Sequence, residues 1–107
     1  MEATTLSAVH NVLRSQAKAD HASYPQYDGY WDGPEWVLVR VTRQVKTKLG
    51  VAFVKGETAL ARRTPPEPDS ENLSPAVRAE LNRPSWTVYS VRNRCNTRLP
   101  LTAAKEI

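Results

Sequence analysis

The sequence is poor in the residues that carry the most specific chemical signatures. Its one cysteine, Cys95, excludes an internal disulfide and a cysteine-based zinc site. Its four glycines form neither a G-x-G-x-x-G nor a G-K-[ST] phosphate loop. No stretch approaches the roughly 20 apolar residues of a membrane span, and Glu2 stands where a signal peptide needs positive charge. We therefore expect a cytoplasmic protein with no cofactor, no metal site and no membrane attachment.

Side chains suited to catalysis are equally scarce. His10 and His21 lie at the edge of the apolar face of the first predicted helix, and Asp20 is too close in sequence to His21 to face it on a helix. Cys95 has Arg94 beside it, but strand alternation would place the two on opposite faces, so we interpret Cys95 as a small buried hydrophobic residue. We predict no catalytic residues and a protein that is not an enzyme.

The composition that remains suits one small domain with an uneven charge. Of the 107 residues, 40% are hydrophobic and 24% are charged, which argues against wholesale disorder and allows one modest core. We treat residues 1–107 as a single domain. The net charge of +4 combines −3 over residues 1–35, +6 over 36–63, −2 over 64–84 and +3 over 85–107. The positive charge is therefore concentrated in particular segments.

Hydrophobic periodicity predicts a helix at the start of the chain. Leu6, Val9 and Leu13 recur at spacings of three and four residues, which is typical of the buried face of a helix. We predict a helix over about residues 5–20, with these three side chains packed on a sheet. Prolines and glycines prevent its continuation, so residues 24–35 are predicted to form an aromatic, acidic loop.

From Trp36 onward the period of the pattern changes to two, which predicts a β-rich part over residues 36–99. Its first strand is expected over residues 36–48, half-buried, with Arg43 as the one basic residue on the apolar side. The further strands are expected at residues 51–54, 58–63, 85–93 and 95–99.

Two further features complete the predicted fold. A Pro-rich loop at residues 64–74 leads into a short helix near 75–82, and residues 100–106 have the pattern of one helical turn. The expected fold class is α+β, in which the N-terminal helix packs on a small curved antiparallel sheet or barrel.

Part of this region resembles SH3-like barrels. The residues concerned are FVKGE (53–57) followed by TALA, then Trp86, then TRLP (97–100), and they cover about half of the chain. They match a F-x-K-G-E turn, a tryptophan that opens a later strand, and a helical turn before the last strand. The segment ahead of the turn reads RVTRQVKTK, where SH3 peptide sites carry acidic residues and tyrosine. The resemblance therefore implies an SH3-like barrel rather than recognition of proline-rich peptides.

The segment YPQYDGYWDGPEW (24–36) is the first candidate surface. Tyrosine and tryptophan are typical hot-spot residues of protein interfaces, whereas acidic groups repel phosphate. We expect Trp36 to be mostly buried and Tyr27 or Trp31 to be largely exposed. A lid that closes the core is the alternative interpretation of the same segment. The candidate protein-binding residues are Tyr24, Tyr27, Tyr30, Trp31, Asp28 and Asp32.

Basic side chains of the predicted strands are the second candidate surface. A positive surface attracts phosphate backbones through counterion release, although an ordinary solvated sheet face would show the same pattern. The candidate nucleic-acid-binding residues are Arg40, Lys46, Lys48, Lys55, Arg62, Arg63, Arg92, Arg94 and Arg98.

The functional hypothesis is a small, non-enzymatic accessory or regulatory protein that binds another protein or a second copy of itself. The first alternative is a nucleic-acid-binding domain that uses the basic sheet face. The second alternative is a small enzyme or enzyme subunit. The size of the chain and its lack of signatures suit a protein encoded by a phage or another mobile element.

Overall fold

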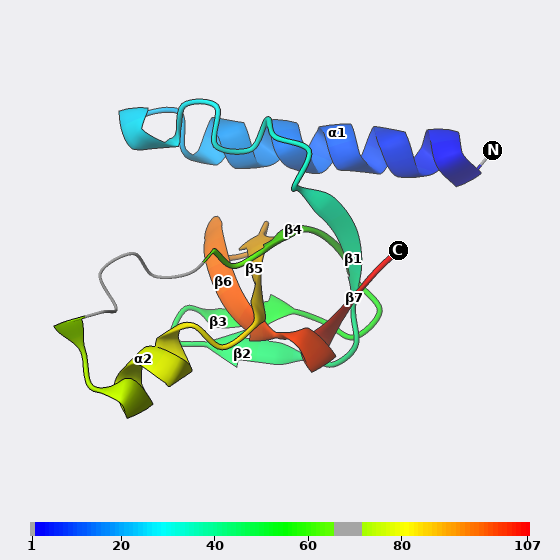
Figure 1. Cartoon of the computed structure of the whole chain (residues 1–107). Helices are drawn as coiled ribbons and strands as arrows, with labels where there is room; N and C mark the ends of the chain where they lie inside the picture. The colour runs from blue at the N-terminus through cyan, green and yellow to red at the C-terminus, as the bar shows by residue number, and fades with distance from the viewer. Residues whose placement is uncertain (1, 66–71) are drawn as a thin grey trace.

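The computed structural model describes residues 2–65 and 72–107 of the chain, with side chains from Thr5 onward (Figure 1). It has an N-terminal helix, a curved antiparallel sheet and a short second helix, so the predicted α+β fold class is confirmed. Most of the predicted Pro-rich loop, residues 66–71, lies outside the described residues. Within the described ranges, neither helix is both long and apolar enough to cross a membrane.

The elements follow one another with short connections. The helical elements are α1 (Glu2–Asp20), the turn η1 (Pro25–Tyr27), α2 (Pro75–Leu81) and the turn η3 (Leu101–Ala103). The strands are β1 (Val37–Val41), β2 (Val45–Thr47), β3 (Gly50–Phe53), β4 (Thr58–Arg63), β5 (Ser85–Ser90), β6 (Cys95–Pro100) and β7 (Ala104–Glu106). Ser74 begins α2 as expected, because its side chain accepts a hydrogen bond from the backbone of Val77.

The strands form two antiparallel sheets. Five of them are ordered β6-β5-β4-β1-β7, and β2 pairs with β3 in a separate hairpin. In Figure 1 the five strands curve around a common interior, with α1 on one side and the hairpin on the opposite side. The main core fills this interior and includes Val39, Phe53 and Trp86, whose Nε1 donates a hydrogen bond to the carbonyl of Ala104.

A second buried cluster joins α1 to the sheet. It consists of Ala17 from the helix, Leu60 and Tyr89 from the strands, and two tryptophans from the connecting loop. Ala17 is the one fully buried side chain among residues 5–20 of α1. The three leucine and valine side chains predicted to be buried there, Leu6, Val9 and Leu13, are only partly buried, because loop aromatics rather than the helix fill much of the space above the sheet.

The predicted strand over residues 36–48 is two strands in the structure. β1 ends at Val41, and the N–H of the next residue, Thr42, still donates a hydrogen bond to the carbonyl of Ala103, which continues the β1–β7 register by one residue. β2 then begins at Val45 as part of the hairpin. Arg43 is exposed and lies between the end of β1 and the start of β2. A basic residue on the apolar side of the predicted strand was therefore a sign that the strand ends there.

The C-terminal segment also differs from the prediction. The helical turn covers only Leu101–Ala103, and the chain then continues as β7, which pairs with β1. Because β1 lies next to the edge of the sheet, this pairing satisfies backbone groups of β1 that would otherwise face solvent. Local pattern alone favoured a helical turn here, whereas the pairing partner lies far away in sequence.

Candidate functional site

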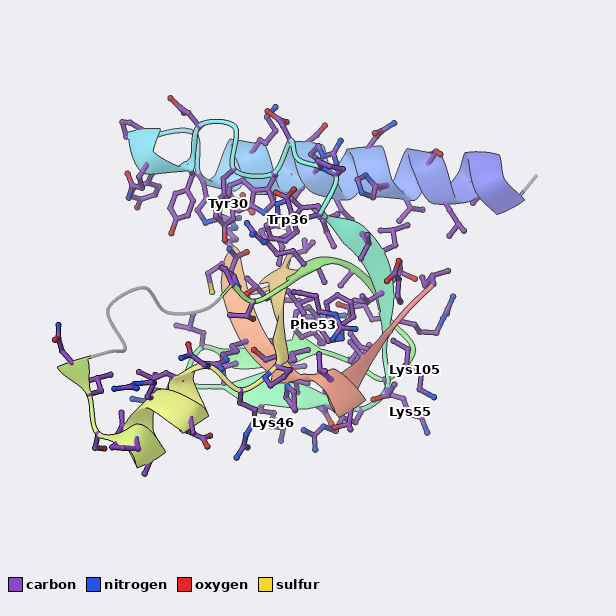
Figure 2. All side chains as sticks on the ribbon, viewed as in Figure 1. Tyr30, Trp36, Lys46, Phe53, Lys55 and Lys105 are labelled. Atoms are coloured by element: carbon purple, nitrogen blue, oxygen red, sulfur yellow. The ribbon has the colours of Figure 1, made fainter. Side chains whose placement is uncertain are left out.

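The aromatic loop, residues 24–35, packs as a lid between α1 and the sheet. Trp31 is 1% exposed and Trp36 is 2% exposed, so the expected burial of Trp36 is confirmed and the expected exposure of Tyr27 or Trp31 is wrong. Tyr27 stacks on Trp31 with ring centroids 5.5 Å apart, and Trp36 Nε1 donates to the carbonyl of Tyr30 at 2.8 Å. The Gly/Pro-rich backbone thus folds the rings inward instead of spreading them over the surface (Figure 2).

Polar contacts connect α1 and its C-terminal end to neighbouring segments. His10 Nε2 lies 2.9 Å from the carbonyl of Trp36, and His21 Nδ1 lies 2.9 Å from the carbonyl of Ala17. The Tyr89 hydroxyl donates a hydrogen bond to the Asp20 carboxylate, and burial together with this carboxylate raises the pKa of Tyr89 well above its usual range. These contacts provide partners for both histidines, Asp20 and Tyr89, whereas Arg14 Nε and Trp31 Nε1 are buried without a hydrogen-bond partner among the described residues.

Only part of the predicted protein-binding set remains at the surface. Tyr24 is 51% exposed, and Asp28 is exposed beside it in sequence. Asp32 is exposed but pairs with Lys18, whose Nζ lies 2.9 Å from Oδ1. Tyr27 and Tyr30 are half-buried against the cluster of Ala17, Trp31, Trp36, Leu60 and Tyr89. The surface that this loop offers a partner is therefore small and centred on Tyr24.

Four of the nine basic candidates are held by contacts within the fold. The guanidinium of Arg62 lies 3.9 Å from Glu35 and over the ring of Trp36, while that of Arg63 lies over the ring of Trp86. Arg92 pairs with Glu57. The remaining member of this group, Arg98, binds the segment after α2.

Arg98 joins β6 to the end of α2. Its Nε donates to Ser85 Oγ at 2.8 Å, and its Nη2 lies 3.0 Å from the carbonyl of Leu81 and 3.1 Å from that of Arg83. The planar guanidinium suits such a multiple contact, which a lysine could not reproduce. Arg94 differs from these four, since it sits exposed in the turn between β5 and β6 with a positive φ of 56°.

The remaining basic candidates lie on the side of the curved sheet away from α1. Figure 2 shows Lys46, Lys55 and Lys105 projecting from this side of the molecule. We call the whole group the basic end, and it consists of Arg40, Arg43, Lys46, Lys48, Lys55 and Lys105. All six are exposed, and none takes part in an ion pair with any carboxylate of the described residues.

The β2–β3 hairpin presents part of the basic end on a fixed support. Phe53 anchors the hairpin in the main core, and Ser90 Oγ donates to the carbonyl of Ala52 at 3.0 Å. Asn93 Nδ2 donates to Thr47 Oγ1 at 3.1 Å, next to the turn that carries Lys48. Lys46 therefore projects from a hairpin whose other face is bound to the five-stranded sheet and its core.

Two members of the basic end were absent from the sequence-based candidates. Arg43 was interpreted as an irregularity of the first strand, and Lys105 was assigned to a helical turn. The structure places Lys105 on β7, directly opposite Arg40 on β1. Arg40 and Lys105 lie together only because β1 pairs with β7, which is far from it in sequence. No pattern among neighbouring residues predicts this contact.

The described residues contain no group of three or more His, Cys, Asp or Glu side chains arranged to hold a metal ion. Cys95 is a free, half-buried thiol. Comparison of the chain with protein-family models, curated protein sequences and solved structures gives no match.

Proposed function

We propose that this protein is a non-enzymatic binding module whose basic end contacts the phosphate backbone of a nucleic acid. The observation that carries the proposal is the set of six exposed cations without an ion-pair partner among the described residues. Cations of this kind release condensed counterions when they meet phosphates, and this release favours binding. We favour nucleic acid over a protein partner because the lid buries Trp31, the largest side chain among the candidate protein-binding residues.

The side chains around the cations indicate how such binding would work. The exposed large apolar residues near the hairpin are Leu49, 69% exposed, and Val54, 40% exposed. Phe53 and Trp86 are buried, so the basic end offers no aromatic ring among the described residues on which a base could stack. We therefore propose contacts to the backbone of a duplex, which position a protein without reading sequence.

A protein partner remains the second candidate function. Tyr24 is the one exposed aromatic ring among the described residues, and Asp28 lies close to it in sequence. Tyrosine is enriched among the residues that dominate binding energy. This surface belongs to the lid beside α1, whereas the basic end lies on the other side of the barrel, so one interaction would leave the other surface accessible.

An SH3-like barrel is the fold that we propose for the β-rich part. The strand order β6-β5-β4-β1-β7 and the helical turn Leu101–Ala103 before the last strand support this assignment. The β2–β3 hairpin occupies the connection between β1 and β4, and it carries lysines instead of acidic residues. The proposed ligand is accordingly a polyanion rather than a proline-rich peptide.

Fluorescence anisotropy with a labelled duplex of random sequence tests the proposed function. The double variant Lys46→Glu/Lys48→Glu reverses two positive charges of the hairpin and should lower affinity at least about tenfold. The matched control Lys18→Glu/Arg83→Glu makes the same change in net charge elsewhere on the surface, where both side chains are in ion pairs. The logarithm of the binding constant should fall with the logarithm of salt concentration, with a slope of about −0.9 per phosphate contact.

The two variants also define the result that would contradict the proposal. If the control lowers affinity as much as the hairpin variant, the attraction reflects net charge and not the basic end. Duplex binding that is absent in low salt would exclude the proposed function directly.

A further inference from the structure

A leucine stands at the tip of the β2–β3 hairpin. Thr47 pairs with Gly50 across the hairpin, so only Lys48 and Leu49 connect the two strands. Leu49 is 69% exposed, the highest value among the large hydrophobic side chains of the described residues, and it belongs to neither buried cluster. Single exposed leucines are common on protein surfaces, but tight turns favour Gly, Asn, Asp and Ser. Packing within the fold therefore gives no reason for a leucine at this position.

Hydrogen bonds to one hydroxyl group fix the conformation of the tip. Thr47 Oγ1 accepts from the N–H of Leu49 at 3.1 Å and from Asn93 Nδ2 at 3.1 Å. It also lies 3.4 Å from the carbonyl of Gly50, whose φ of +107° suits glycine. Because these contacts order the turn before any ligand is bound, the tip loses little conformational freedom on binding.

Positive side chains from two turns flank Leu49. Lys48 precedes it, and Lys46 lies two residues further back on β2. Arg94 follows Asn93, the residue of the β5–β6 turn that contacts the hairpin. All three cations are exposed, and none is in an ion pair with a carboxylate of the described residues. Contacts from these cations to the phosphates of a duplex would therefore bring Leu49 to the groove between the strands.

The dimensions of the two grooves indicate which of them Leu49 enters. The minor groove of B-DNA is about 6 Å wide and the major groove about 12 Å wide, so one leucine side chain can fill only the narrower groove. The hairpin is not a free ribbon that could lie along the major groove. Phe53 is buried in the main core, and Ser90 Oγ donates to the carbonyl of Ala52, so one face of the hairpin is covered.

We propose that Leu49 enters the minor groove of a bound duplex and separates two neighbouring base pairs. Apolar side chains that insert in this way partly unstack the bases and bend the duplex. The free-energy cost of unstacking is lowest at flexible pyrimidine–purine steps such as TA. The inference rests on the proposed function, since phosphate contacts bring the tip to the groove. It adds a preference for flexible base steps to binding that otherwise does not read sequence.

The experiment uses a duplex with one central TA step, in which 2-aminopurine replaces the adenine of that step and fluoresces more strongly when it is unstacked. Binding of the unsubstituted protein should raise the fluorescence severalfold. Leu49→Met keeps an apolar side chain and should retain this increase, whereas Leu49→Ala should abolish it. Leu49→Ala should also bind the duplex about tenfold more weakly, because less apolar surface is buried. Its salt dependence should be unchanged, because no charge is altered.

The matched control is Val12→Ala, which truncates a side chain of α1 that is 66% exposed and lies away from the hairpin. This variant should keep both the affinity and the fluorescence increase. A second duplex, with the stiffer step AA in place of TA, should bind the unsubstituted protein severalfold more weakly. Leu49→Ala should bind the two duplexes equally.

Three results would overturn the insertion of Leu49 while leaving the proposed function intact. They are duplex binding without a fluorescence increase, an increase that survives in Leu49→Ala, and an increase that is lost equally in Val12→Ala. Equal affinity of the unsubstituted protein for the TA and AA duplexes would refute the preference for flexible steps. If neither duplex binds in low salt, the proposed function itself is wrong, and the insertion with it.

Discussion

The hydroxyl group of Tyr89 on β5 donates a hydrogen bond to the carboxylate of Asp20, the last residue of α1. The ring of Tyr89 is 1% exposed and packs in the cluster beneath the lid. Tyr89 therefore contacts α1 in two ways. Its ring packs in the hydrophobic cluster that contains Ala17, and its hydroxyl group binds the carboxylate at the C-terminal end of the helix.

Removing the Tyr89 hydroxyl should destabilise the protein by about 1.5–3 kcal/mol, the range for hydrogen bonds to charged groups. Tyr89→Phe keeps the ring in the cluster and deletes only the donor. Asp20→Asn removes the charge of the acceptor, and the two changes should be less than additive because they break the same contact. Urea denaturation of the four proteins of this cycle measures the coupling, and additive free energies of unfolding would show that the contact contributes nothing.

The same hydrogen bond should make the protein sensitive to alkaline pH. Burial and the Asp20 carboxylate raise the pKa of Tyr89 in the folded state, so folding disfavours the phenolate. In the unfolded chain tyrosine ionises near pH 10. The contribution of Tyr89 to the free energy of unfolding is therefore fully present below about pH 10 and decreases as the pH rises above that value. Unfolding midpoints of Tyr89→Phe should fall less steeply over that pH range than those of the unsubstituted protein.

Trp31→Ala should cost about 3–5 kcal/mol of folding free energy, the usual result of deleting a fully buried aromatic ring. Tyr24→Ala is the matched control, because its ring belongs to the same loop but is 51% exposed. That change should alter stability by no more than about 0.5 kcal/mol. Thermal denaturation followed by circular dichroism distinguishes the two, and similar losses for both variants would contradict the division of the loop into lid and surface.

Arg98→Lys should loosen α2 while leaving the sheet intact. The substitution keeps the positive charge but cannot bridge Ser85 Oγ and the carbonyl groups that follow α2. Because α2 has no buried residue, its stability depends on such contacts. Amide hydrogen exchange in α2 should accelerate about tenfold or more, while exchange in β5 stays unchanged. Unaltered exchange in α2 would mean that other contacts hold it.

The local sequence pattern correctly predicted those elements whose boundaries depend on neighbouring residues. Ser74 and Pro75 mark the start of α2, and the alternation around Val88 marks β5, both of which the structure contains. Pattern failed where a distant partner decides the conformation. The segment after Ala103 becomes a strand because β1 lies beside it, and residues after Val41 leave the sheet to form the hairpin.

The candidate site was predicted only in part for the same reason. Lys46 and Lys48 are two residues apart and so share the polar face of a predicted strand, which is why the sequence alone identified them as candidates. The opposition of Arg40 and Lys105 depends on strand pairing across the whole β-rich part. Trp31 is likewise buried because it packs between α1 and the strands β4 and β5. The acidic residues next to it in sequence predicted exposure and gave no sign of these distant contacts.

The placement of α1 and the β2–β3 hairpin on opposite sides of the curved sheet separates the charges of the molecule. Exposed carboxylates such as Asp28 belong to the helix side, and the unpaired lysines belong to the hairpin side. Such a separation produces an electric dipole moment, so a nearby polyanion exerts a torque that turns the hairpin toward it before contact. If the proposed function holds, each bound molecule meets the duplex in one orientation, with α1 facing away from it.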